Sequence, residues 1–355
     1  MVDSLENILY SFFTLPFIFG YHINRSLTSV GHKGPVSEHF DGKRFWNIGE
    51  REGLLPSQAH VAPRHHTKNR SLFEWMLHHK KHAWSSSTVP EVRVPERSEE
   101  LLITVINHST VLIQMHGINI ITDPIYSKRA SPYKFIGPLR FVNPRITLEN
   151  LPPIDLLLLS HNHYDHMDMD TLKHIAQTHN PHIVTGLGNK EYLRHRGVTR
   201  VKEAEWFETH SFIIGKTAVH IDLVPAQHFS ARSLSDRNKT LWGGFVIRAH
   251  DKKIYMAGDS GYGPFVKKIA ERYPSGFTVG LLPIGAYMPE SYMRRVHMNP
   301  REALQIMKDL QIQKGIAIHF GTFPLADDTQ REPLEDLADA LQSDEFAGLH
   351  FEVQK

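Results

Sequence analysis

The sequence lacks cysteine and long blocks of charge. Its 355 residues contain no cysteine, so disulfide bonds and thiolate metal sites are excluded, and any zinc ion must be held by histidine and aspartate side chains. The formal net charge is only +2, and no long block of one sign occurs. This balance gives no support to nucleic-acid binding, and we expect no nucleic-acid partner. The sequence also shows no internal repeat and no low-complexity tract.

No apolar run is long and continuous enough to predict a membrane span. The nearest candidate is residues 8–23, which are almost wholly apolar and aromatic. Asp3 and Glu6 precede this segment and no small-residue cleavage site follows it, unlike in a secretory signal. Three interpretations of residues 1–23 stay open: contact with a membrane interface, packing on the domain, or an uncleaved anchor or signal.

Residues 24–100 form an N-terminal extension with little periodicity. Between Arg25 and Arg97 it has twelve Lys or Arg against seven Asp or Glu. Such an excess belongs to a solvated face or suits an anionic lipid surface. We therefore expect peripheral membrane association, on the cytoplasmic side. Within this extension, residues 73–84 predict a short amphipathic helix.

From residue 101 the pattern changes to short apolar strands and helical stretches. An apolar content of 41% lets a chain of this length bury a large core, in one catalytic domain with extensions or in two domains. We expect one α/β catalytic domain over residues 101–355, with two mixed sheets flanked by helices in an αββα sandwich. Strands are predicted at residues 101–106, 110–115, 118–122 and 156–159, near 183, and at 219–224, 244–248, 253–257, 278–282 and 315–318. Helices are predicted at residues 171–177, 189–196, 264–272, 301–310 and 334–341.

The most informative segment is residues 160–166, which read Ser-His-Asn-His-Tyr-Asp-His. A short apolar run precedes it and predicts a buried strand, so these side chains lie at a strand's carboxyl end. His161 and His163, two residues apart in extended chain, face one side and can bind one metal ion. Asp165 and His166 follow as the chain turns and can reach a second ion. A histidine-rich surface loop is the alternative, but the spacing favours a two-metal hydrolase site.

A site with two metal ions needs more than four protein ligands. His228, Asp259 and His319 each follow a predicted strand directly or within a few residues. Each of them alone is more often structural, but their shared position at strand ends, taken with the first motif, favours a common site. Gly258 and Gly261 flank Asp259 closely and allow the backbone to approach a metal-bound oxygen. A carboxylate at this position can bridge both ions.

These residues and several flanking segments resemble a known family. The chain is similar to hydrolases of the metallo-β-lactamase fold and, among them, to the N-acylphosphatidylethanolamine-hydrolysing phospholipases D. Phe229 and Phe320 stand where the family pattern has tryptophan, a difference that affects the shape of the pocket. The similarity covers residues 101–335 and rests on the metal-ligand positions and on residues 122–127, 225–229, 241–244, 257–262, 283–287 and 317–323.

The resemblance implies the metallo-β-lactamase fold and two Zn²⁺ ions per chain. It also implies cleavage of a phospholipid between phosphorus and the ethanolamine oxygen, which yields phosphatidic acid and an N-acylethanolamine. Asp165 and Asp259 would then serve catalysis as well as metal binding. A homodimer with an apolar groove for acyl chains is also implied. The implied ligands are His161, His163 and His228 for one zinc ion, Asp165, His166 and His319 for the other, and Asp259 for both.

Two further histidines and two other functions stay open. His297, ahead of a predicted helix, can orient the phosphate or protonate the leaving group, unless this segment only caps the helix near Asn299. His108 either lines the site or is a structural histidine. A lactonase or another phosphodiester hydrolase can use the same two-metal scaffold. A metal-binding protein that docks on membranes without catalysis is the alternative from a different class.

Overall fold

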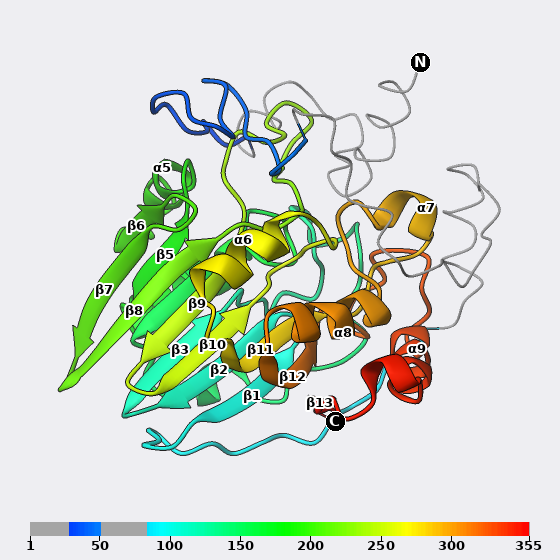
Figure 1. Ribbon diagram of the computed structural model, residues 1–355. Coiled ribbons are helices and arrows are strands. Elements are labelled where there is room, and N and C mark those ends of the chain that lie inside the picture. The colour runs from blue at the N-terminus through cyan, green and yellow to red at the C-terminus, as the bar shows by residue number, and fades with distance from the viewer. Residues whose placement is uncertain (1–27, 51–83, 355) are drawn as a thin grey trace.

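The computed structural model describes residues 28–50 and 84–354. Two mixed β-sheets pack face to face at its centre, with helices on the outer faces, and this confirms the predicted αββα sandwich (Figure 1). The first sheet has the order β1-β2-β3-β4-β5-β6, with β1 (Leu102–Asn107), β2 (Thr110–Met115), β3 (Ile118–Thr122), β4 (Leu156–Leu159), β5 (His182–Gly186) and β6 (Val201–Ala204). The second sheet has the order β13-β12-β11-β10-β9-β8-β7, with β7 (Thr209–Ile214), β8 (Thr217–Val224), β9 (Gly244–Ala249), β10 (Lys252–Met256), β11 (Phe277–Pro283), β12 (Ile312–Ile318) and β13 (Phe351–Glu352).

Strand direction brings four strand ends to one edge of the sandwich. In the second sheet, β8 and β10 both pair antiparallel with β9, so they run in the same direction. β12 runs in that direction too, because β10, β11 and β12 are parallel. In the first sheet β3, β4, β5 and β6 are parallel. The residues that follow β4, β8, β10 and β12 are the predicted ligands, so this topology gathers them.

Both faces of β4 are buried, which explains its continuous leucine run. Leu156 and Leu158 belong to the core between the two sheets, whereas Leu157 and Leu159 pack in the core under the outer helices. All four side chains are fully buried. A strand that is covered on both faces has an uninterrupted apolar sequence, whereas a strand with one face in solvent alternates apolar and polar residues.

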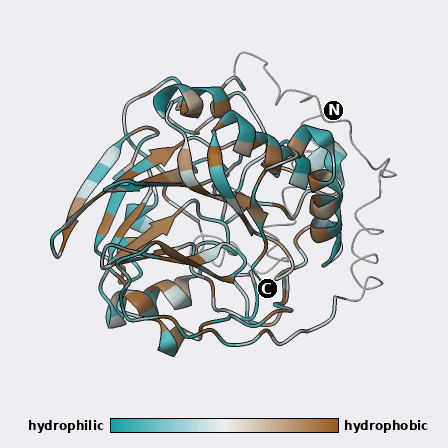
Figure 2. Ribbon diagram, turned by 60° about the horizontal axis from the view of Figure 1, so that its bottom comes forward, coloured by the Kyte–Doolittle hydropathy of each residue, from teal (hydrophilic) through white to brown (hydrophobic). Residues whose placement is uncertain are grey.

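Amphipathic helices cover the outer faces of the sheets. Figure 2 shows apolar residues along the strands and a mixture of polar and apolar residues along the helices. α8 begins with a capping box in which the Asn299 side chain accepts from the Glu302 amide and Glu302 bonds back to the Asn299 amide. The helices are α4 (Met169–Thr178), α5 (Lys190–Arg194), α6 (Phe265–Arg272), α7 (Glu290–Met293), α8 (Pro300–Asp309) and α9 (Glu332–Leu341), with 3₁₀ turns at Leu148–Asn150 and Asp344–Phe346.

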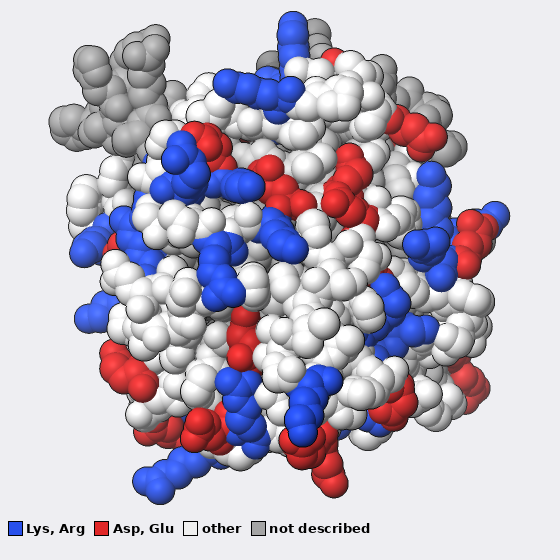
Figure 3. Space-filling model, turned by 90° about the vertical axis from the view of Figure 1, so that its left-hand side faces the viewer, with Lys and Arg blue, Asp and Glu red and all other residues white. Residues whose placement is uncertain are grey.

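Part of the N-terminal extension packs into the sandwich. Phe40 and Phe45 are buried in the core between the sheets. The predicted segment at residues 8–23, and residues 73–83 of the predicted amphipathic helix, lie outside the described residues. Among the helices that are described, none has the length and apolar character that crossing a membrane requires. On the face in Figure 3, positive and negative side chains are interspersed.

The predicted strands and helices agree with the structure to within a few residues, but three strands were missed. β6 reads Val-Lys-Glu-Ala and lies at the edge of its sheet, so it lacks an apolar pattern. β7 is the edge strand of the second sheet, and only Phe212 among its residues is buried. β13 has two residues. Edge strands that are short or partly exposed to solvent show little hydrophobic periodicity, since few of their side chains enter the core.

The two-sided burial of β4 predicts the effect of cavities on either face. Leu157→Ala and Leu158→Ala should each lower the free energy of unfolding by about 2 to 5 kcal/mol, because both remove fully buried atoms. Denaturant unfolding at equilibrium measures this loss. Ile213→Thr, at a side chain that is 79% exposed, is the control and should stay within about 0.5 kcal/mol of the original protein. A neutral effect of either leucine change would mean that one face of β4 is not buried.

Candidate metal centre

The loops after β4, β8, β10 and β12 bring all seven predicted ligands together. None of these residues is more than 7% exposed. Together with His108 and His297 they form two groups of four donors and a third, overlapping group of Asp259, His297 and His319, and in each group the ligand atoms lie within 4.8 Å of one another. The seven residues are His161, His163, Asp165 and His166 after β4, His228 after β8, Asp259 after β10 and His319 after β12.

The first group contains His161, His163, His228 and Asp259. Nδ1 of His163 lies 2.8 Å from Nε2 of His161 and 3.2 Å from Nε2 of His228. Oδ2 of Asp259 lies 3.8 Å from Nε2 of both His161 and His228. Three imidazoles and one carboxylate are a typical donor set for zinc.

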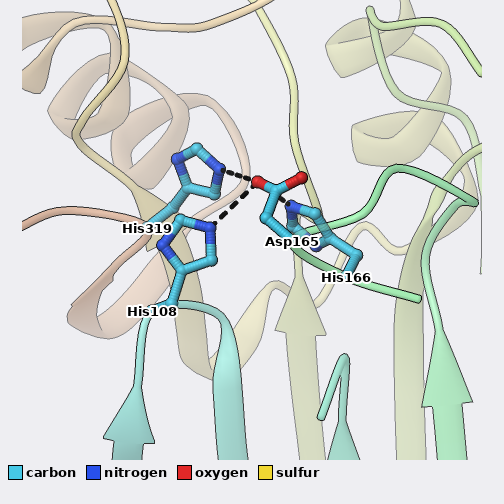
Figure 4. A group of neighbouring side chains, drawn as sticks. All are labelled: His108, Asp165, His166 and His319. Carbon is cyan, nitrogen blue, oxygen red and sulfur yellow. Dashed lines mark hydrogen bonds and ion pairs between the residues drawn. The ribbon is translucent and has the colours of Figure 1, made fainter. Parts of the chain in front are cut away.

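The second group contains His108, Asp165, His166 and His319 (Figure 4). Oδ2 of Asp165 lies close to three imidazoles, at 3.0 Å from Nε2 of His108, 3.3 Å from Nε2 of His166 and 3.4 Å from Nε2 of His319. Oδ2 of Asp259 lies 3.1 Å from Nε2 of both His166 and His319. Asp259 therefore stands between the two groups, in the position of a bridging ligand.

The donor atoms fit metal ions better than they fit one another. At 2.8 Å, Nε2 of His161 and Nδ1 of His163 point at each other, and this pair also faces Nε2 of His228. Three ring nitrogens cannot all be paired by hydrogen bonds within such a triangle, whereas all three can point lone pairs at one cation. In the two ligand groups, His166 Nε2, which faces Asp165 and Asp259, and Asp259 Oδ1 are buried without a hydrogen-bond partner among the described residues. A buried polar atom without a partner is costly, so these two atoms favour bound ions.

Burial sets the protonation of the first group. Burial and the neighbouring imidazoles hold the pKa values of His161, His163 and His228 well below the usual histidine range. These rings are therefore neutral at pH 7. A metal ligand must be a neutral imidazole, so this group is ready for metal binding without loss of a proton.

In the second group the carboxylates outweigh burial, so the pKa values of two histidines are raised instead of lowered. Burial favours the neutral ring of His319, but Asp259 and Asp165 outweigh burial and raise the pKa of this histidine to about 9. The same carboxylates raise the pKa of His166 well above its usual range despite burial. Burial opposes ionisation of both aspartates, yet these imidazoles hold the aspartate pKa values well below the usual range. A metal ion would displace the two imidazole protons and pair with the same carboxylates.

Asp123 orients the second group from behind, and the sequence analysis assigned it no role. Its Oδ2 lies 2.8 Å from Nδ1 of His166 and accepts from the Ser160 hydroxyl at 2.6 Å. This contact places a proton on Nδ1 of His166, which leaves Nε2 to face the site. Asp123 directly follows β3, which pairs with β4 in parallel, so a carboxylate at this strand end was the available signal. Ser160 Oγ also contacts Nδ1 of His161 at 2.9 Å.

Several residues of the site adopt the left-handed backbone conformation. φ is 45° at His108, 35° at Asp123 and 57° at His319. Such values cost on the order of 1 to 3 kcal/mol each in residues other than glycine. The conformation is held by hydrogen bonds, among them one from the His319 amide to the His108 carbonyl at 2.9 Å. At Gly258, where φ is 64°, a Cβ would lie 2.8 Å from the Gly243 carbonyl oxygen, so glycine is required next to Asp259.

His297 faces the site, and Asn299 caps α8. The His297 ring lies 5.0 Å from the ring of His228 and 5.2 Å from that of His319, and it is buried. Burial and the nearby His319 lower its pKa to about 4 against the opposing carboxylates, so the ring is neutral. The capping interpretation therefore holds for Asn299 and does not account for His297. Phe229, in place of the expected tryptophan, packs 4.4 Å from the His163 ring.

Known proteins resemble this chain in sequence and in fold. Residues 118–320 match the model of the β-lactamase superfamily domain. The chain belongs to the β-lactamase superfamily. Its expected metallo-β-lactamase fold is thereby confirmed, and superfamily membership together with the buried donors marks the chain as a metal-dependent hydrolase.

Within the superfamily, the chain is similar to two phospholipases. N-acyl-phosphatidylethanolamine-hydrolyzing phospholipase D 1 of Caenorhabditis elegans is 36% identical over 68% of this chain and 71% of that protein. The mitochondrial N-acyl-phosphatidylethanolamine-hydrolyzing phospholipase D of Saccharomyces cerevisiae is 37% identical over 62% of this chain, which spans about half of the yeast protein's length, 48%. Igni18, a metallo hydrolase of Ignicoccus hospitalis KIN4/I, shares the fold with a TM-score of 0.53 and 22% identity, over 72% of this chain and 95% of that one.

The two donor groups predict two metal ions that can be removed separately. Purified protein should hold close to two ions per chain, because each group offers a complete donor set. His228→Ala should deplete the ion of the first group and His319→Ala the ion of the second. Elemental analysis gives the count, and anomalous scattering gives the position. Loss of the same ion from both variants would contradict this partition of ligands.

Proposed function

We propose that the protein is a di-zinc phosphodiesterase that hydrolyses N-acylphosphatidylethanolamine-type phospholipids to phosphatidic acid and an N-acylethanolamine. The observation that carries this proposal is the position of Asp259 between two groups of buried donors, in a chain that is 36% identical to a phospholipase of that name. His161, His163 and His228 would hold one zinc ion, and Asp165, His166 and His319 the other. Two such ions supply Lewis acidity at the phosphoryl oxygen and activate water.

The charge of the site favours a phosphodiester over a lactone. Two Zn²⁺ ions would outweigh the two carboxylates of Asp165 and Asp259, so the loaded site is positive. A phosphodiester carries a negative charge at pH 7, whereas a lactone is neutral and gains nothing from this field. Asp259 would keep the two donor groups at a fixed separation. The His297 ring, which lies beside His228 and His319, would hydrogen-bond a phosphoryl oxygen and so orient the phosphate.

A basic loop beside the site is the proposed contact with lipid. Residues 127–140, termed here the basic loop, contain four Lys or Arg and no Asp or Glu. Phe135 is 80% exposed, and Ile136 and Leu139 are 39% exposed each. Large apolar side chains among cations are typical of segments that enter an anionic interface. We propose peripheral membrane association through this loop. A homodimer stays a prediction from the family resemblance, and a cytoplasmic orientation stays a prediction from the N-terminal extension.

The base of the basic loop is fixed to the metal-binding loop. The Ser127 hydroxyl donates to Asp168 at 2.9 Å, two residues beyond His166, and Arg140 donates to the Ser127 carbonyl at 3.2 Å. A cavity of about 650 Å³ lies between the two loops, and Tyr126, Tyr133, Tyr164, Met167 and Tyr192 are among the residues that line it. None of the seven candidate ligands lines this cavity, which meets the metal-binding loop at Tyr164 and Met167.

The substrate proposal is tested by comparing two substrates in one purified sample. N-acylphosphatidylethanolamine should be converted to phosphatidic acid and N-acylethanolamine, detected by mass spectrometry, while lactones turn over far more slowly. Asp259→Asn should lower kcat by at least about 100-fold with a smaller change in KM, because it removes the charge shared by both donor groups. Faster turnover of lactones would favour the lactonase. Zinc content without turnover of any ester would indicate the metal-binding docking protein.

The basic loop predicts a separate effect on lipid binding. Phe135→Ser combined with Ile136→Ser should weaken binding to vesicles that contain anionic lipid by about tenfold or more, since burial of one large apolar side chain contributes roughly 1.5 to 3 kcal/mol. Vesicle cosedimentation measures this binding. A short-chain soluble phosphodiester should still be cut at a rate within about threefold. Ile213→Ser, at an exposed residue of edge strand β7, is the matched control. Equal binding by the loop variant and the control would refute the docking role.

A further inference from the structure

Asn47, from the N-terminal extension, pairs with the backbone of His228. Its Nδ2 donates to the His228 carbonyl at 3.0 Å, and its Oδ1 accepts from the His228 amide at 3.0 Å. Asn47 is 9% exposed and lies 181 residues away from His228 in the chain. The Asn47 side chain thus makes the two backbone hydrogen bonds with His228 that a neighbouring strand would make. At this point β8 has already ended, at Val224.

The remaining hydrogen-bonding capacity of Asn47 is used as well. Oδ1 also accepts from Nε1 of Trp242 at 3.1 Å, and Nδ2 also donates to Oε2 of Glu50 at 3.1 Å. An asparagine amide has two donor hydrogens and two acceptor lone pairs, so all four are satisfied. The reverse orientation would set the NH₂ group against two donors and the oxygen against two acceptors. The network therefore permits one orientation, and the pairing with His228 is specific.

His228 needs this support because its ring must face two other donors. Its Nδ1 bonds to the Val296 carbonyl at 2.9 Å, which fixes the rotation of the ring and directs Nε2 at Nδ1 of His163. The Val296 contact does not fix the position of the peptide that carries the ring. Asn47 fixes the position of that peptide, because it bonds to both the amide and the carbonyl of His228. A shift of about 1 Å in a ligand's backbone would separate Nε2 from its partners and weaken a metal site.

Asn47 itself is held rigidly by the segment around it. Phe45, two residues earlier, is fully buried between the sheets, and its amide donates to the Asn238 carbonyl at 2.7 Å. The Asn47 amide donates to Glu50 at 2.9 Å. Residues 28–50 therefore act as a fixed brace, although they lie outside the superfamily domain at residues 118–320.

We propose that Asn47 is a positioning residue for the first metal ion: by clamping the peptide of His228, it sets the affinity of the group formed by His161, His163 and His228. The inference rests on the ligand assignment in the proposed function. It places a determinant of metal binding in the N-terminal extension. Loss of an outer partner of a metal ligand typically weakens metal binding 10- to 100-fold.

The test uses full-length protein that has been depleted of metal and is then titrated with Zn²⁺ against a chromophoric chelator. Asn47→Leu, which keeps the branched shape of the side chain and removes all four hydrogen bonds, should weaken the binding of one of the two ions by about 10- to 100-fold and leave that of the other within about threefold. Zinc anomalous scattering should place the retained ion at Asp165, His166 and His319. The visible spectrum of Co²⁺-loaded protein should lose the contribution of one ion only.

The chain offers a matched control in Asn143. Its Oδ1 accepts from the Val89 amide at 3.0 Å and its Nδ2 donates to the Val89 carbonyl at 3.5 Å, the same kind of clamp on a residue that is no ligand. Asn143→Leu should leave both zinc affinities within about threefold of the original protein. Equal weakening by the Asn47 and Asn143 variants would mean that the effect is general destabilisation and would overturn the proposal.

A second variant covers the case in which Asn47→Leu does not fold. Asn47→Asp keeps the acceptor for the His228 amide and Trp242 but loses the donations to the His228 carbonyl and to Glu50, so the same ion should again be the one weakened. Two retained ions of unchanged affinity in either variant would overturn the positioning role and leave the proposed function intact. Failure of the original protein to bind zinc would instead refute the metal assignment on which both proposals rest.

Discussion

The contacts of Asp259 with two imidazoles join the halves of the molecule. Its Oδ2 lies 3.1 Å from Nε2 of His166 and 3.1 Å from Nε2 of His319. His166 follows β4 of the first sheet, whereas Asp259 and His319 follow strands of the second. A buried carboxylate that loses its partners costs several kcal/mol, so the two sheets are held at one separation and one offset. Only at that offset does Asp259 lie between the two donor groups.

Each part of the cluster is then supported by a contact from outside it. Asp123 holds the ring of His166, the Val296 carbonyl holds the ring of His228, and Asn47 holds the His228 backbone. These partners come from β3, from the segment before α8 and from the N-terminal extension. Left-handed backbone at His108 and His319 adds strain, which the hydrogen bond from the His319 amide to the His108 carbonyl helps to offset. The centre is therefore preorganised by much more of the chain than the ligands themselves.

The candidate ligands could be singled out because their signals are local. Four of the seven lie within six residues, at His161, His163, Asp165 and His166, and each of the others follows an apolar strand of the kind that a buried sheet requires. The outer partners had no such signal. Asn47 stands in a segment without periodicity, and its partner is 181 residues away. Edge strands β6 and β7 were missed for the related reason that few of their side chains enter the core.

The sequence by itself determined the donor set, the absence of thiolates, the main strands and the family, because residue type and short spacing are written in order along the chain. Only the tertiary structure decided which donors share a group, that Asp259 stands between the groups, and that His108 contacts Asp165. Those relations depend on strand direction and on the offset between two sheets. Both arise from packing of side chains across the whole core, and no stretch of sequence contains them.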